Sequence, residues 1–304
     1  MLVALLLAAP AFAGADLTSP APPAGATMIR LPAMTLVMLR MSERVNSDRS
    51  AAGYRFHFTV SEPVRSAGRI VIPVGAQGEG EVIHAAESGG HNHPGELVLA
   101  ARFVRVGAEE VKLRSFVAGA TDRANDALAV PIFDRHTGGG RGDPANLGRG
   151  GVASARTAVA VRLPAIESDP AESADSAQAV DVAPAIDASA TTGTIVLFRE
   201  FIAGGTKPPF QIHDGVALLG ELANGNYFAV QLPVGIHHLT ARGPNFDDLS
   251  VEIDSGETYY VACSQGNPSF LSNCSPSNRS QFDYMKSDLR MVEGARPPSA
   301  GQAK

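Results

Sequence analysis

Three histidines in a short stretch, His84, His91 and His93, are the residues best suited to bind a metal ion. Imidazole nitrogens are frequent zinc ligands, and Glu81 or Glu87 could supply a carboxylate oxygen as a further ligand. Paired glycines and a Pro-Gly step flank the last two histidines, which places them in a hairpin loop. No second metal-binding motif occurs in the chain, so the pattern favours a polar loop tip, with a metal site as the alternative.

Two further polar pairs lie in the C-terminal half. His237 and His238 are neighbours on an expected strand, where successive side chains point to opposite faces, so they cannot chelate one ion. Asp247 and Asp248 adjoin an expected turn, a position where aspartate is common for structural reasons.

Ser264 lies in the sequence Ala-Cys-Ser-Gln-Gly, which approaches the Gly-x-Ser-x-Gly pattern of serine hydrolases. That pattern requires a helix directly after the serine, but Asn267 and Pro268 follow it. It also requires a histidine later in the chain, and His238 is the last one. The sequence therefore predicts no serine hydrolase.

A glycine-rich run at residues 138–144 matches no phosphate-binding loop, because neither the Gly-Lys-Ser/Thr ending nor the dinucleotide pattern is present. Arg141-Gly142-Asp143 within it reproduces an integrin-binding tripeptide, which we attribute to chance in a glycine-rich loop. We expect no cofactor and no set of catalytic residues.

The first thirteen residues, Met-Leu-Val-Ala-Leu-Leu-Leu-Ala-Ala-Pro-Ala-Phe-Ala, have the apolar core and Ala-x-Ala ending of a secretory signal peptide cleaved after Ala13. The usual positive charges are missing, so the true start could lie upstream. The alternative is a buried helix or membrane anchor, but the apolar run is shorter than the roughly 20 residues that a membrane span requires. We expect a periplasmic or secreted protein with no transmembrane segment in the mature chain.

Cys263 and Cys274 are the only cysteines. In an exported chain an even number of cysteines favours a disulfide, here closing a short loop. The alternative is two free buried thiols.

Composition narrows the class of protein further. With 304 residues the chain is long enough for two domains, and its 31 glycines, 21 prolines and 6% aromatic residues favour turn-rich β structure. The net charge of −6 gives no basic surface for nucleic acid, so nucleic acid is not an expected partner.

Residues 215–261 consist of short apolar runs separated by turn residues, as in consecutive antiparallel strands. Phe228, Val230 and Leu232 alternate with other residues, which gives one apolar face. Asn224-Gly225 supplies the positive φ angles of a two-residue hairpin.

The turn glycines and aromatic residues of this stretch resemble PEGA-type and related domains of unknown function in bacterial envelope proteins. The resemblance covers residues 193–265 and is carried by Asp214-Gly215, Gly220-Glu221-Leu222, Gly225-Asn226-Tyr227, Pro233-Val234-Gly235-Ile236-His237 and Gly256-Glu257-Thr258-Tyr259-Tyr260. It implies a small β-sandwich and an envelope location, and it carries over no catalytic residue.

The N-terminal half shows the same alternation, for example in Tyr54, Phe56, Phe58 and Val60. Residues 35–118 resemble a small β-barrel module of bacterial envelope and secretion proteins, including TrbI-like conjugation components. The residues concerned are Val71-Ile72-Pro73-Val74-Gly75-Ala76, Gly80-Glu81-Val82 and Gly95-Glu96-Leu97.

The sequence thus predicts an all-β protein made of two small antiparallel β domains, a barrel or sandwich followed by a PEGA-like sandwich, joined by a disordered linker. The expected divisions are a signal peptide (1–13), a disordered segment (14–30), an N-terminal domain (31–163) with a Gly-rich loop (134–151) and a return strand (157–163), a linker (164–192), a C-terminal sandwich (193–274) and a polar tail (275–304). In that tail Phe282, Met285, Leu289 and Val292 could form one face of a short helix.

These observations favour a non-catalytic protein of the bacterial cell envelope that has a binding or structural role. Its partner would be another envelope protein or a cell-wall polymer. The alternative is a metal-binding or metal-dependent envelope enzyme that uses the His84–His93 region.

Overall fold

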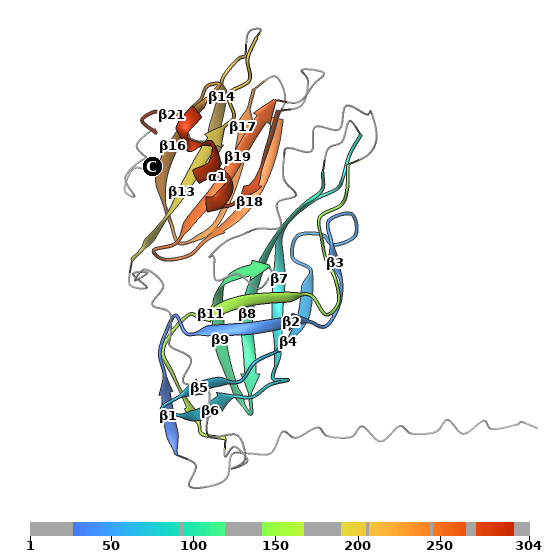
Figure 1. Ribbon diagram of the computed structural model, residues 1–304, viewed down its shortest axis with the longest axis vertical. Helices are drawn as coiled ribbons and strands as arrows, with labels where there is room; N and C mark the ends of the chain where they lie inside the picture. Colours follow the sequence, from blue (N-terminus) through green and yellow to red (C-terminus); the bar gives the residue numbers. More distant parts are fainter. Residues whose placement is uncertain are drawn as a thin grey trace, which may run out of the picture.

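The computed structural model describes residues 27–90, 94–118, 142–166, 190–204, 207–243, 246–265 and 272–294. These residues form β-strands, one α-helix and one short 3-10 helix, arranged as a barrel unit and a two-sheet unit (Figure 1). The predicted all-β fold is therefore confirmed. The predicted signal peptide, residues 14–26, residues 134–141 of the Gly-rich loop and most of the linker lie outside the described residues.

The N-terminal unit is built around a closed barrel in the strand order β11-β2-β4-β7-β8-β9. Its strands are β1 (Met28–Leu31), β2 (Leu36–Met41), β3 (Val45–Asn46), β4 (Arg55–Val60), β5 (Val64–Ser66), β6 (Arg69–Ile72), β7 (Gln77–Ala86), β8 (Glu96–Val106), β9 (Glu109–Ala118), β10 (Asn146–Leu147), β11 (Val152–Thr157) and β12 (Val161–Pro164). Small two-stranded sheets, β1-β12, β3-β10 and β5-β6, flank the barrel.

Two aromatic rings in the interior of the barrel lie opposite two glycines of the neighbouring strand. Phe56 and Phe58 of β4 point inward, and the strand register places them opposite Gly80 and Gly78 of β7. The ring of Phe56 also makes an edge-on contact with Phe116, with centroids 5.9 Å apart. The glycines leave the space that the two buried rings occupy, which explains why β7 carries glycine at both positions.

The return strand that we predicted over residues 157–163 is divided in the structure. β11 ends at Thr157, whose hydroxyl donates to the carbonyl of Pro32 at 2.7 Å. The chain bends there, and β12 starts at Val161 to pair with β1 outside the barrel. The period-2 pattern continues through the bend, so alternation alone could not reveal it.

The C-terminal unit is a sandwich of a five-stranded sheet, β20-β19-β13-β16-β21, and a four-stranded sheet, β15-β14-β17-β18. Its strands are β13 (Thr192–Arg199), β14 (Phe210–Asp214), β15 (Ala217–Leu222), β16 (Asn226–Pro233), β17 (Gly235–Arg242), β18 (Phe246–Ile253), β19 (Thr258–Gln265), β20 (Ser272–Ser277) and β21 (Arg290–Met291). Phe228, Val230 and Leu232 are buried between the sheets, as their alternation predicted.

The hairpin predicted at Asn224-Gly225 is wrong in its pairing. A turn is present, with Gly225 at φ 73°, but β15 and β16 belong to different sheets. The side chain of Asn224 accepts the N–H of Ile202 and donates to its carbonyl, both at 3.0 Å. The turn therefore connects one sheet to the other. Tertiary contacts, and not the turn residues alone, determine which sheet the next strand joins.

The predicted disulfide between Cys263 and Cys274 is present. The two residues face each other on β19 and β20, and their sulfur atoms are bonded. Both cysteines are buried in the sandwich core.

Reduction of this disulfide is expected to lower the free energy of unfolding of the sandwich by about 3 kcal/mol, because the bridge restricts a short loop in the unfolded chain. Urea unfolding with and without a reductant measures the difference. Free thiols detected on the denatured, unreduced protein would contradict the bridge.

The helix α1 (Arg279–Met285) covers the five-stranded sheet. Asn278 caps its first turn, and Phe282 packs edge-on against Phe198 and Tyr227 at centroid distances of 5.4 and 5.1 Å. The chain then continues through the 3-10 turn η2 (Lys286–Asp288), so Leu289 lies beyond the helix whose face we expected it to share. No helix among the described residues is long and apolar enough to cross a membrane.

Candidate functional site

His84 lies where the barrel meets the sandwich. The ends of β7 and β8 extend past the barrel as a hairpin arm (residues 83–86 and 96–98) that contacts β18 (Figure 1). Nδ1 of His84 accepts the backbone N–H of Ser250 at 3.2 Å. This bond places the proton of a neutral His84 ring on Nε2, which lies 3.4 Å from the carboxylate of Glu96. His84 thereby supplies a hydrogen-bond acceptor to β18, which is the edge strand of the four-stranded sheet.

The metal site that the sequence offered as an alternative around His84 is not assembled in the described part of the chain. His91 and His93 lie outside the described residues. Within those residues no group of three His, Cys, Asp or Glu side chains has the arrangement of a metal site. Glu81 accepts from Nε of Arg102 at 2.9 Å, and Nδ1 of His84 is occupied by Ser250.

Two carboxyl groups, one buried and one half-buried, lie in the same contact. Glu96 on the arm is 4% exposed and accepts a hydrogen bond from the hydroxyl of Ser275 on β20. Asp247 on β18 accepts the N–H of Cys274 at 2.5 Å. Burial, reinforced by the nearby charge of Glu96, raises the pKa of Asp247 to about 7.

The serine, carboxylate and histidine of this contact do not form a catalytic triad. Ser275 donates to Glu96, and Glu96 in turn faces His84. In a triad the imidazole lies between the serine and the carboxylate so that it can take the hydroxyl proton. The order found here stabilises the contact and cannot activate the serine in that way.

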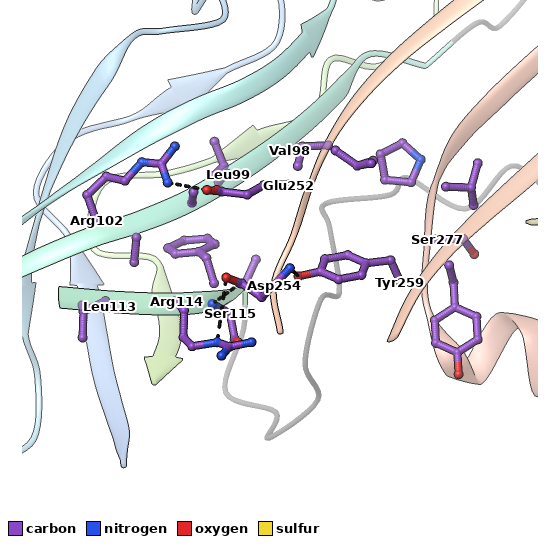
Figure 2. A pocket seen from close by; sticks show the side chains of 18 residues that line it. Val98, Leu99, Arg102, Leu113, Arg114, Ser115, Glu252, Asp254, Tyr259 and Ser277 are labelled. Atoms are coloured by element: carbon purple, nitrogen blue, oxygen red, sulfur yellow. Dashed lines mark hydrogen bonds and ion pairs between the residues drawn. The ribbon is translucent and has the colours of Figure 1, made fainter. Parts of the chain in front are cut away.

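A second contact is made by the turn between β18 and β19, which we call the docking turn (residues 254–257). It contacts Ser115 of β9, which lies in a β-bulge and has a φ angle of 56° (Figure 2). The Ser115 N–H donates to Oδ2 of Asp254 at 3.1 Å, and its hydroxyl donates to Oε1 of Glu257 at 2.6 Å. A left-handed backbone at a non-glycine residue is unfavourable, so the contact with the turn helps to retain it.

Arg114, the residue before Ser115, also contacts the docking turn (Figure 2). Its Nη2 donates to the carbonyl of Ser255 at 2.6 Å and lies 3.9 Å from Glu257, and its Nε lies 3.8 Å from Asp254. Burial raises the pKa of Glu257, whereas the bond from Ser115 and the charge of Arg114 lower it. The net direction is upward, so burial outweighs the favourable partners.

Charge complementarity also occurs at a second place in the joint, beside the docking turn. Arg102 of β8 donates to Glu81 at 2.9 Å within the barrel and to Glu252 of β18 at 2.6 Å. Residues 246–265 of the sandwich contain five acidic residues and no lysine or arginine. The acidic strand pair therefore meets two arginines of the barrel.

A crevice of about 70 Å³ runs between the two contacts, and Figure 2 shows its lining. Val98 packs against the sandwich core from the barrel side, and Tyr259 accepts the N–H of Asp254 through its hydroxyl at 2.8 Å. Burial raises the pKa of Tyr259 well above its usual value. The volume is enough for a few water molecules but well below the several hundred Å³ of a typical metabolite pocket.

The remaining residues singled out by the sequence lie apart from the joint or act on their own. His237 contacts Asp214 at 2.6 Å and the carbonyl of Pro233 at 2.8 Å, whereas His238 contacts the hydroxyl of Ser250 at 2.9 Å. The two rings make separate contacts, as their strand positions predicted. Ser264 lies on β19 opposite Asn273.

Sequence reasoning missed the residues that form the joint, including Arg102, Arg114, Ser115 and Glu257. One available sign was that residues 246–265 contain five acidic residues and no lysine or arginine, which favours a basic surface opposite them. Which arginines would supply that surface is not visible in a chain with cations scattered along its strands.

Comparison of the chain with family models, with curated proteins and with solved structures finds no match.

Proposed function

We propose that this chain is an exported, non-catalytic protein of the bacterial cell envelope, in which the barrel and the sandwich are held together as one binding or structural unit. The observation that carries the proposal is the use of the polar side chains at the joint. His84, Ser115 and Ser275 each hold a partner in the other unit. Groups that could otherwise serve catalysis are thus engaged in joining the two units.

Three further observations support this function. The crevice at the joint is too small for a typical metabolite. The disulfide suits an oxidising compartment such as the periplasm. The N-terminal sequence has the features of a secretory signal, and both halves resemble modules of envelope proteins.

The partner would be an envelope protein or a cell-wall polymer that binds a surface outside the joint. To test this, the full-length protein is expressed in a bacterial host, and its N-terminus and location are determined. We expect a chain starting at Gly14 in the periplasmic or envelope fraction, and sedimentation of the purified chain with either isolated cell walls or isolated envelope membranes. An intact Met1 on protein from the cytoplasmic fraction would contradict export. If the chain sediments with neither the cell walls nor the membranes, the binding role is contradicted.

The metal-dependent alternative makes a different prediction for zinc titration. Because the described residues contain no metal-site arrangement and Nδ1 of His84 accepts the Ser250 N–H, we expect no one-to-one zinc binding in calorimetry, either for the natural chain or for His84→Ala. Saturable one-to-one binding that disappears in the double variant His91→Ala, His93→Ala would instead favour the alternative. Circular dichroism of each variant provides the control for folding.

A further inference from the structure

The two carboxyl groups of the arm contact converge on one short piece of the sandwich. Glu96 of the barrel accepts from the Ser275 hydroxyl, and Asp247 of the sandwich accepts from the N–H of the preceding residue, Cys274. The carboxyls therefore lie close together across the joint, and the negative charge of Glu96 acts on Asp247. In the described part of the chain no lysine or arginine forms an ion pair with either carboxyl.

The other charged groups around Asp247 do not supply the missing positive charge. The neighbouring Asp248 adds repulsion, and the ring of His84 interacts more weakly with Asp247 than Glu96 does. On β17, Ala241 lies opposite Asp247, and β20 has no ionisable side chain apart from the bridged Cys274. The arginines of the adjacent strands are engaged elsewhere, Arg102 with Glu81 and Glu252, and Arg199 with the carbonyls of Pro208 and Leu222.

We propose that the Glu96–Asp247 contact is a pH-dependent latch between the barrel and the sandwich. It holds while one of the two carboxyls is protonated, and it loosens when both are charged. Glu96 is buried and Asp247 is half-buried, and two such carboxylates close together without a cation repel each other in a medium of low dielectric constant. This inference does not depend on the proposed function, because it concerns only the joint.

The direction of the effect follows from proton binding. The pKa of Asp247 is about 7 in the closed joint and 3.8 for an ordinary aspartate, so the closed state binds the extra proton. The stabilisation of the closed joint by this proton is fully present below pH 3.8 and is lost as the pH rises through about 7. The equilibrium constant for closure should therefore fall about tenfold between pH 6 and pH 9.

Hydrogen exchange of the Ser250 amide measures this opening in the full-length protein, because that amide donates to His84 across the joint. After correction for intrinsic exchange rates, its protection should fall about tenfold from pH 6 to pH 9 in the natural chain. The variant Asp247→Asn keeps an oxygen acceptor for the Cys274 N–H and removes the charge. It should keep the protection of the low-pH form at pH 9, and because His84 is present in both chains, the difference between them isolates Asp247.

Two controls separate the latch from other causes. Amides of β13, inside the sandwich, should show no comparable loss, since they do not report on the joint. The variant Glu96→Gln removes the opposing charge and should reduce the change at Ser250 even if Asp247→Asn folds poorly. The proposal is overturned if Asp247→Asn follows the pH dependence of the natural chain, or if β13 loses protection in parallel with Ser250.

Discussion

Replacing Gly80 with alanine is expected to destabilise the barrel by about 3 kcal/mol or more, the upper part of the range for overpacked cores. A Cβ at this position would overlap the ring of Phe56 and would lie 2.7 Å from the carbonyl oxygen of Ala100. The ring cannot turn away easily, because Phe56 is fully buried and is held against Phe116. The carbonyl oxygen belongs to β8, which pairs with β7 in the barrel. Urea unfolding followed by circular dichroism measures the loss.

A matched control is available in the same unit. Gly148 has an unstrained backbone, and no atom lies within 4 Å of the position that an alanine Cβ would take there. Gly148→Ala should therefore change stability by less than about 0.5 kcal/mol. Equal stability of Gly80→Ala and Gly148→Ala would show that β4 and β7 can separate without cost. The close packing of the rings against β7 would then not be a source of barrel stability.

Replacing Arg114 with alanine is expected to weaken the joint by about 3–5 kcal/mol, the usual cost of removing one partner of a buried charge pair. The change removes the hydrogen bond from Arg114 to the Ser255 carbonyl. It also removes the stronger of the two cations that act on Glu257, which is 2% exposed, and leaves only Arg156. We expect the barrel and the sandwich to unfold in separate urea transitions in this variant. The amide of Ser115, which donates to the docking turn, should lose hydrogen-exchange protection.

Arg105→Ala is the control for Arg114→Ala. Arg105 is on β8 and pairs with Glu110 on the surface, with both side chains more than half exposed, so its loss should cost less than about 1 kcal/mol. Adding Glu257→Gln to Arg114→Ala should recover part of the loss, because it removes a buried charge that has lost its stronger cation. A joint that tolerates Arg114→Ala as well as Arg105→Ala would refute the role of the docking turn.

The sequence was most informative where local patterns and local structure coincide. The alternation of Phe56, Phe58 and Val60, and of Phe228, Val230 and Leu232, correctly predicted strands with one buried face. The cysteine pair was also predictable, because the chain has only two cysteines, eleven positions apart, and the features of an exported protein. In each case the residues that determine the structure are close together in the chain.

The pairing of elements was less predictable. Asn224-Gly225 correctly predicted a turn, but the hydrogen bonds of Asn224 with Ile202 direct the next strand into the other sheet. A turn pattern fixes the local backbone, whereas the partner of each strand depends on packing over long separations. The bend after Thr157 has the same origin, since its partner Pro32 is more than a hundred residues away in the sequence.

The sequence alone determined the β character of both halves, the disulfide and the expectation of export, because these depend on composition and on short-range patterns. Only the tertiary structure decided how the barrel and the sandwich meet. His84 was considered as a metal ligand and Asp247 as a turn residue, yet the fold brings both to the joint, near Glu96 and Ser275. The physical reason is that burial and neighbouring charges, which set the chemistry of an ionisable group, come here from residues more than a hundred positions apart.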